Sequence, residues 1–500
     1  MKYSTLICGA AVLDGSGTEE KFLDVAISAD GTLSVHPHNS GLSADETVNG
    51  DGLYLAPGFI DVHTHDDTAV IKTPEMMNKI SQGVTTVIVG NCGISASPVT
   101  IRDELPNPMN LIGEKHDFIY PEFSGFVKAV DKARPNVNVA ALVGHTSLRN
   151  NHMTDLFRPA SAKEIKAMKL QLRQALKEGA IGLSSGLAYN SAFEAPESEI
   201  IALIEEVAAA GGIYTTHMRT EFDGILNAVN ESFDSAVSHR VPLIISHLKC
   251  AGSANWGRSV EVLKLISERS DSHPFACDCY PYSASSSNLD PGQVTDAYDI
   301  FITWSEPHPD KSGKLLTEIA TGWNLSLIET AYKLMPAGAV YHCMSEEDVQ
   351  NILKYERTMI GSDGLPHDPH PHPRLWGAFP RVLSRYCREL NLFDLPTAVN
   401  KMTGLPAREF RIKNRGRIED GYNADLVLFD PEKIRDTATY NDPKKPAEGI
   451  EKVWVNGMLT YSNGKLLDGR AGRFLKRQGG RRLSQAYSLG KEEEISNTEY

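Results

Sequence analysis

The central part of the chain alternates short apolar, β-branched runs with amphipathic stretches of helical period. This alternation is typical of a parallel sheet whose strands are joined by crossover helices. The strand-like runs are 55–62, 85–89, 137–143, 180–183, 212–216, 242–246, 275–278 and 358–361. The helical stretches between them include 162–178, 196–210, 224–238 and 259–270. Eight such units predict a (β/α)₈ TIM-type barrel.

Both ends of the chain have a different pattern, with short strand-like runs separated by turn residues. These runs cover 5–13, 22–28, 33–36 and 52–55 near the start, and 424–429, 452–455 and 458–461 near the end. The last two are separated by Asn456-Gly457, a strong hairpin signal. We therefore predict a small β-sandwich built from both chain ends. The expected organisation is 1–56 and 411–475 for this sandwich and 57–410 for the barrel.

Two further segments depart from the barrel pattern. The connection between the seventh and eighth strand-like runs is much the longest, and we expect it to hold a helical insert over 284–345, with amphipathic helix around 312–335. The final segment, 476–500, is rich in Arg, Ser and Glu without an apolar period, and we expect it to be poorly ordered.

Composition narrows the class of protein. The chain has 500 residues, 41% of them hydrophobic, and a net charge of -14, which argues against a nucleic-acid or anionic-membrane partner. No apolar stretch approaches the roughly 20 residues that span a bilayer, and the run 5–13 reads as a first strand rather than a signal peptide. Seven scattered cysteines favour free thiols over a disulfide framework. We expect a cytoplasmic protein.

Chemically active side chains follow the predicted strands, at the point where each strand ends. They are His63 and His65, Cys92, His145, Ser185, His217, His247, Tyr280 and Asp363. In a barrel these positions share the C-terminal rim, where active sites of this architecture are built.

The pair His63-Thr64-His65 places two imidazoles on one face of an extended strand, because side chains alternate with a period of two. Two nitrogens so placed suit one metal centre. A bare His-x-His pattern is more often two solvated histidines. The preceding segment 57–61, PGFID, at the first barrel strand favours the metal.

The motifs as a set resemble the amidohydrolase superfamily and, within it, the N-acyl-D-amino-acid deacylases, or D-aminoacylases. The first-strand signature is PGFIDVHTHDD. The others, in the family's order, are GVTTVIVGNCGIS, GHTSLR, GLSSGLAY, THMRTE, ISHLKCAG, YPYSASSS, MIGSDG, PHPRLWGAFPRVL and GRIEDGYNADLVLFD. The resemblance covers about residues 50 to 430. It implies a barrel with a small β-sandwich from both chain ends, which agrees with the pattern above.

The resemblance also implies a zinc site. It places His63, His65, Cys92, His217 and His247 on the metal-ligand positions. Many relatives bridge two metals with a carboxylated lysine, but segment 180–189 contains none, and in the D-aminoacylases a cysteine such as Cys92 takes that role. A thiolate is a soft, anionic zinc ligand. We expect one tightly bound Zn²⁺ and a second, weaker position.

Catalytic roles follow from the same resemblance. Asp363, in GSDG, matches the residue that takes a proton from the attacking water and returns it to the leaving nitrogen. On its own, Ser362-Asp363-Gly364 could be an Asx turn. Tyr189 is a candidate donor to the scissile carbonyl oxygen.

Substrate binding is expected at four residues. Lys249 and Arg374 match the family's carboxylate-binding positions, and Tyr280 and Ser286 match the other donors. The implied reaction is hydrolysis of a small N-acyl-D-amino acid to a D-amino acid and a carboxylate. Members acting on N-acyl-D-glutamate carry an added arginine after strand seven, whereas segment 281–309 contains no Lys or Arg and does contain Asp290. We therefore expect a preference for neutral or apolar side chains.

Two other functions are compatible with the fold. One is another amide hydrolase, such as a dihydropyrimidinase-like ring opener, which the missing strand-four lysine disfavours. The other is a non-catalytic scaffold on the same fold, which the complete set of ligand positions and Asp363 disfavours.

Overall fold

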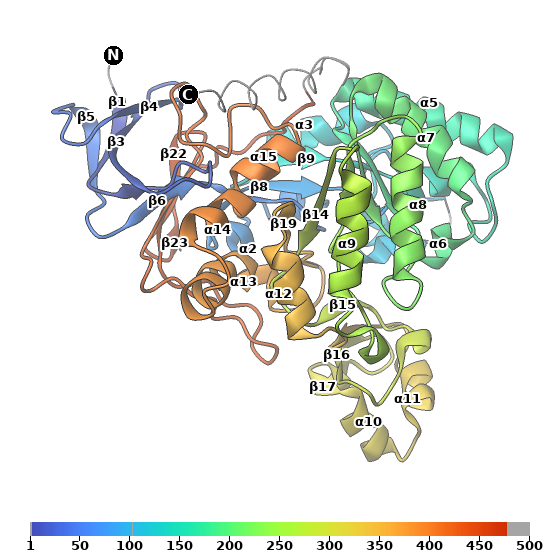
Figure 1. The fold of residues 1–500 in the computed structure, drawn as a ribbon. Helices are drawn as coiled ribbons and strands as arrows, with labels where there is room; N and C mark the ends of the chain where they lie inside the picture. The colour runs from blue at the N-terminus through green and yellow to red at the C-terminus, as the bar shows by residue number, and fades with distance from the viewer. Residues whose placement is uncertain (1–2, 103, 478–500) are drawn as a thin grey trace.

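The structure is a computed structural model that describes residues 3–102 and 104–477. Within these residues, eight parallel strands form the predicted barrel (Figure 1). They are β7 (Phe59–Asp61), β8 (Val84–Val89), β9 (Asn138–Ala141) continued by β10 (Val143–Gly144), β11 (Gly182–Gly186), β12 (Ile213–His217), β13 (Leu243–Ile245), β14 (Phe275–Cys279) and β19 (Thr358–Ile360). The predicted (β/α)₈ barrel is confirmed.

The barrel closes where the eighth strand meets the first. Just beyond the two strands, Thr64 and Gly364 form a parallel bridge, and the backbone N–H of Asp363 donates to the carbonyl of His63 at 2.8 Å. Inward-pointing side chains such as Ile60, Ile88 and Ile244 fill the interior as one apolar cluster. The barrel is therefore a packed core, and chemistry is left to its rim.

Helices cover the outside of the barrel. They are α1 (Ala69–Lys72), α2 (Met77–Ile80), α3 (Phe123–Ala133), α4 (His145–His152), α5 (Ala162–Glu178), α6 (Asn190–Phe193), α7 (Glu197–Ala210), α8 (Ile225–Val237), α9 (Ser259–Ser270), α12 (Glu346–Lys354), α13 (Arg374–Arg381), a π-helix (Val382–Glu389), α14 (Leu395–Met402) and α15 (Gly404–Glu409). The four helices named from sequence periodicity, α5, α7, α8 and α9, agree with the prediction to within one residue at each end.

Helix α5 illustrates why these boundaries are predictable. Ser161 and Glu164 form a reciprocal capping box at its start, and Gly179 at its end has a φ of 121°. Met168 and Leu172 lie one turn apart on its buried face. Cap, apolar stripe and terminating glycine are all local signals, so the sequence alone specifies the helix.

The strands assigned to a β-sandwich lie in one continuous ten-stranded sheet within the described chain, in which β2 pairs with both β3 and β6. Strands of the two chain ends meet where β6 pairs antiparallel with β20, and Val25, Leu428 and Trp454 share the apolar cluster beside the sheet. The strands are β1 (Tyr3–Cys8), β2 (Ala11–Val12), β3 (Lys21–Ser28), β4 (Leu33–Pro37), β5 (Ala44–Asn49), β6 (Tyr54–Pro57), β20 (Leu426–Phe429), β21 (Ile450–Val455), β22 (Met458–Ser462) and β23 (Lys465–Leu466).

The insert between β14 and β19 is only partly helical, so that prediction is wrong in part. It contains α10 (Leu316–Trp323) and α11 (Leu327–Leu334), but also an antiparallel sheet, and it projects from the barrel (Figure 1). The sheet consists of β15 (Ser285–Asn288), β16 (Ile300–Ser305), β17 (Lys314–Leu315) and β18 (Ala337–Tyr341). Strand β15 has the sequence Ser-Ser-Ser-Asn, which carries no strand signal; its pairing with β18 makes it a strand.

Two remaining predictions concern the end of the chain and the membrane. The expected poorly ordered tail, 476–500, lies outside the described residues from 478 onward. Every helix in the described ranges is too short or too polar to cross a bilayer.

Candidate functional site

The five residues predicted as metal ligands meet at the C-terminal rim of the barrel. His63 and His65 follow β7, Cys92 follows β8, His217 ends β12, and His247 follows β13. Their ligand atoms form two groups, and within each group all atoms lie within 4.8 Å of one another. The groups are His63, His65, Cys92 and Asp363, and Cys92, His217 and His247.

Cys92 is the residue shared by both groups. Its Sγ lies 3.2 Å from His63 Nε2 and 3.3 Å from His247 Nε2, and the side chain is buried. Burial raises the pKa of the Cys92 thiol, but the imidazoles of His63 and His247 outweigh that effect and hold the pKa well below its ordinary value. The site therefore favours a thiolate. A buried thiolate surrounded by imidazoles is a donor set that fits Zn²⁺.

The position of the Cys92 thiolate depends on close packing between the backbones at the ends of β8 and β11. Cys92 has a φ of 53°, in the left-handed region that non-glycine residues rarely adopt. A Cβ on Gly186 would lie 2.2 Å from the Cys92 carbonyl oxygen, and a Cβ on Gly93 would lie 2.6 Å from the Gly186 nitrogen. Two glycines thus let the ends of β8 and β11 touch. His247 and Asp363 also have positive φ, at 34° and 49°, so three residues of this site have strained backbone.

Asp278 contacts two of the predicted metal ligands, His63 and His247, and sequence reasoning missed it. Its Oδ2 lies 3.3 Å from His63 Nδ1, and its Oδ1 accepts the backbone N–H of His247 at 2.9 Å. Holding Nδ1 in this way turns His63 Nε2 toward Cys92. The signal was available: Cys277 and Cys279 pack in the outer apolar cluster, so the intervening residue of β14 faces inward.

Glu221 was also missed, and it changes the surroundings of Lys249. Its Oε1 lies 2.8 Å from His247 Nδ1 and forms a buried ion pair with Lys249. Burial raises the pKa of Glu221, but Lys249 and His247 outweigh it and hold the pKa far below its usual range. Lys249 Nζ is itself 2.8 Å from His247 Nδ1. Glu221 stands four residues after His217, within the quoted motif THMRTE, which was the available signal.

Asp363 lies between the histidines and Arg374. Its Oδ1 is 3.1 Å from His65 Nε2, and its Oδ2 is 2.9 Å from Arg374 Nη1. Burial raises the pKa of Asp363, but Arg374 and the His65 hydrogen bond hold it well below its ordinary value. The carboxylate is therefore ionised and able to accept a proton.

Several buried donors near Asp363 lack partners. Among the described residues, nothing hydrogen-bonds to Tyr280 Oη or Ser286 Oγ, although both are buried. The Arg374 guanidinium lies 4.5 Å from the centroid of the Tyr280 ring, and its Nη2 donates to the Ser286 carbonyl at 3.3 Å. Since buried polar groups are nearly always paired, these three residues suit a polar group of a bound ligand.

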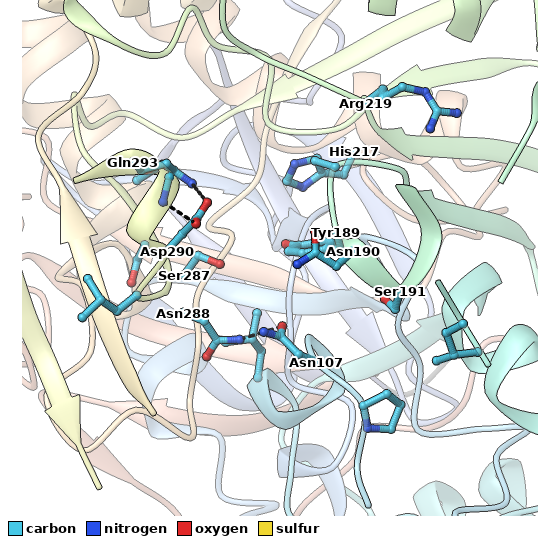
Figure 2. A pocket seen from close by; sticks show the side chains of 18 of the residues that line it. Asn107, Tyr189, Asn190, Ser191, His217, Arg219, Ser287, Asn288, Asp290 and Gln293 are labelled. Carbon is cyan, nitrogen blue, oxygen red and sulfur yellow. Dashed lines mark hydrogen bonds between the residues drawn. The ribbon is translucent and has the colours of Figure 1, made fainter. Parts of the chain in front are cut away.

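A cavity of about 1300 Å³ opens over this cluster. His65, His217, Lys249 and Asp363 lie on its wall. Figure 2 shows Ser287, Asn288, Asp290 and Gln293 on one side and Tyr189, Asn190 and Ser191 on the opposite side. The Tyr189 ring lies 4.9 Å from that of His217, and burial holds the pKa of its phenol well above the ordinary value, so it remains a hydrogen-bond donor.

Comparison with known proteins agrees with this geometry. The model of the amidohydrolase family matches residues 46–239 and 347–461. D-aminoacylase of Alcaligenes xylosoxydans xylosoxydans is 43% identical over 475 residues, which cover 95% of this chain and 98% of that protein. N-acyl-D-glutamate deacylase of the same organism is 42% identical, with 95% and 97% covered.

A solved structure extends the likeness to three dimensions. The crystal structure of N-acyl-D-glutamate deacylase from Bordetella bronchiseptica, complexed with zinc and a phosphonate mimic of the tetrahedral intermediate, superposes with a TM-score of 0.92 at 40% identity. It covers 95% of this chain and 100% of that one. The family resemblance expected from the motifs is confirmed, and the chain belongs to the amidohydrolase family.

Proposed function

We propose that this protein is a zinc-dependent deacylase that hydrolyses N-acyl-D-amino acids to a D-amino acid and a carboxylate. The observation that carries the proposal is Cys92: its buried thiolate joins two clusters of imidazoles, directly beside the ionised carboxylate of Asp363. The relatives named above support the D configuration and the linear amide. The missing lysine in segment 180–189 continues to disfavour a ring opener built on a carboxylated lysine.

Zinc would be held by His63, His65, Cys92, His217 and His247. Cys92 belongs to both groups of ligand atoms, so its thiolate would be a ligand for an ion in either group. When bound, zinc supplies a Lewis acid for the amide carbonyl and lowers the pKa of a water toward about 7.

Asp363 and Tyr189 carry the proton chemistry. The ionised Asp363 accepts the proton of the attacking water and returns it to the leaving nitrogen, so that the amine departs neutral. The Tyr189 phenol, on the cavity wall beside His217, donates to the carbonyl oxygen as negative charge develops there.

The substrate's α-carboxylate binds on the other side of Asp363. Arg374, Tyr280 and Ser286 supply donors there, and two of them have unpaired buried oxygens. Arg374 offers a planar fork, so it can contact Asp363 and the substrate together. Lys249 lies on the cavity wall and adds positive charge, although Glu221 already pairs with it.

The side-chain preference follows from the charges on the cavity wall. Asp290 lies on that wall, and the segment 281–309 supplies no cation. Arg219 also reaches the wall, but it forms an ion pair with Glu231 at 2.6 Å, and Arg102 at the rim donates to the Asn151 carbonyl. A buried carboxylate without a free cation is costly. Neutral, largely apolar D-residues are therefore the preferred substrates.

The first prediction tests the reaction itself. N-acetyl-D-methionine should be hydrolysed by the zinc-loaded protein, N-acetyl-L-methionine should not, and N-acetyl-D-glutamate should have a kcat/KM lower by about ten-fold or more. Release of free amine measures all three. No hydrolysis of any D-substrate would refute the proposed activity, and an advantage for the glutamate derivative would refute only the side-chain preference.

The second prediction concerns the thiolate. Cys92→Ala removes a ligand shared by both metal positions, so zinc affinity should fall by more than the 10–100-fold that loss of an outer-shell partner typically costs. Zinc measured per protein after dialysis checks this. Cys277→Ala is the matched control, since Cys277 is an equally buried barrel cysteine outside the ligand groups. Full zinc and normal turnover in Cys92→Ala would make Cys92 a packing residue.

The third prediction concerns the acid–base group. Asp363→Asn keeps the shape of the side chain but cannot accept a proton, so kcat should fall by about 10²–10⁴-fold while zinc content is retained. Steady-state kinetics and metal analysis are the measurements. A kcat within a few-fold of the parent would assign the base to another residue.

The fourth prediction separates carboxylate binding from acid–base tuning. Arg374→Ala should lower kcat/KM for N-acetyl-D-methionine by about 10–100-fold, the equivalent of one charged hydrogen bond, and much less for its methyl ester. The same variant loses the charge that depresses the pKa of Asp363. Activity needs the ionised form, so the acid limb of the pH–rate profile should move to higher pH. Equal losses on acid and ester would contradict the carboxylate role.

A further inference from the structure

A buried lysine lies beneath the metal site and is not among its ligands. Lys79, on α2, is completely buried. Its Nζ lies 2.8 Å from Asp61 Oδ2, 3.1 Å from Asp66 Oδ2 and 2.9 Å from Ser362 Oγ. Both carboxylates are buried as well, so one ammonium group holds two acidic side chains away from water.

Each partner of Lys79 is next to a residue of the proposed site. Asp61 stands two residues before His63, Asp66 directly follows His65, and Ser362 directly precedes Asp363. The other oxygen of Asp61, Oδ1, accepts the backbone N–H of Ser362 at 2.8 Å. The lysine therefore joins the end of strand one to the end of strand eight, at the seam where the barrel closes.

The link through Lys79 lies directly beside Asp363, whose position relative to the histidines is critical for the proposed chemistry. Asp363 has a left-handed backbone, with a φ of 49°, so the neighbouring structure must hold it in place. Its carboxylate lies 3.1 Å from His65 Nε2 and 3.5 Å from His63 Nε2. A shift of strand eight relative to strand one would change both distances at once.

Packing alone does not account for a charge at this position. Taking an ammonium group and two carboxylates out of water is costly, and replacing the whole charged cluster by apolar side chains would fill the same space without that cost. The Lys79 ammonium group has three polar partners on two strand ends. This arrangement fits a role in fixing the relative position of those strand ends rather than a role in adding stability.

We propose that Lys79 is a positioning residue, which sets the place of Asp363 relative to His63 and His65. The proposal rests on the proposed function for the role of Asp363, but the geometry it predicts can be measured without substrate. Lys79 is not in either group of ligand atoms or on the cavity wall, and it acts through Asp61, Asp66 and Ser362.

The test compares Lys79→Met and Lys79→Arg with Lys401→Met. Lys401 is the matched control because it is also a buried lysine close to strand eight, donating to the carbonyls of Tyr355 and Thr358 at the opposite end of that strand. Three quantities are measured for each protein: zinc affinity by chelator competition, the absorption spectrum of the Co²⁺-substituted form, and kcat and KM for N-acetyl-D-methionine. Thermal melting reports whether each variant folds.

Lys79→Met should lower kcat by about ten-fold or more with KM within a few-fold, as expected when the support of a catalytic group is lost. It should also weaken zinc binding and alter the Co²⁺ spectrum. Lys79→Arg keeps the charge and should recover part of each effect. Lys401→Met should lower the melting temperature but leave kcat and the spectrum unchanged.

The opposite results overturn the proposal. A parent-like spectrum, zinc affinity and kcat in Lys79→Met, or equal changes in Lys401→Met, would make Lys79 a structural residue only. If Lys79→Met does not fold, Lys79→Arg decides, and parent-like values in all three measurements refute the proposal. A parent inactive on every N-acyl-D-amino acid would refute the proposed function, while zinc affinity and the Co²⁺ spectrum would still test the role of Lys79.

Discussion

Closure of the barrel between its first and last strands is the constraint on which the site depends. His63 and His65 leave strand β7, and Asp363 leaves β19, 298 residues after His65. Hydrogen bonding between these two strand ends brings them together, including the bond from the Asp363 N–H to the His63 carbonyl at 2.8 Å. The eight-stranded architecture is therefore what allows the proposed ligands from the start of the barrel to share one centre with the proposed base from its end.

Charge balance is the second requirement of this centre. Cys92, Glu221 and Asp363 place acidic groups within a buried volume, and such groups stay ionised only when positive charge lies beside them. Lys249 compensates Glu221, and Arg374 compensates Asp363. A divalent cation among the imidazoles would compensate the Cys92 thiolate. Metal binding and ionisation of the cluster are thus coupled, because each lowers the cost of the other.

The residues predicted from the sequence and the residues missed differ in their physical signal. His63, His65, Cys92 and Asp363 each follow a strand-like run, and strand ends are visible in the hydrophobic pattern. Asp278 lies inside a strand, between two cysteines. It can be recognised as a site residue only when it is known which face of that strand points into the barrel.

The sequence analysis missed Glu221 and the sheet of the insert for related reasons. Glu221 acts through His247 and Lys249, which stand more than 25 residues away along the chain, so its motif places it near His217 but does not reveal these two contacts. Strand β15 is polar throughout and becomes a strand only by pairing with β18, about 50 residues later. In both cases the deciding contact is made after the chain has folded, and propensity is a weak guide to such contacts.

The division between barrel and insert explains why relatives with different substrates resemble this chain equally well. D-aminoacylase and N-acyl-D-glutamate deacylase are 43% and 42% identical to it, so overall identity does not report side-chain preference. The proposed ligands and Asp363 come from the strand ends of the barrel, whereas Ser287, Asn288 and Asp290 on the cavity wall come from the connection after β14. A change of charge at one or two positions of that connection alters the cost of burying an acidic side chain without moving any proposed ligand. Specificity can therefore change while the chemistry of the rim is kept, because the two are built on different parts of the fold.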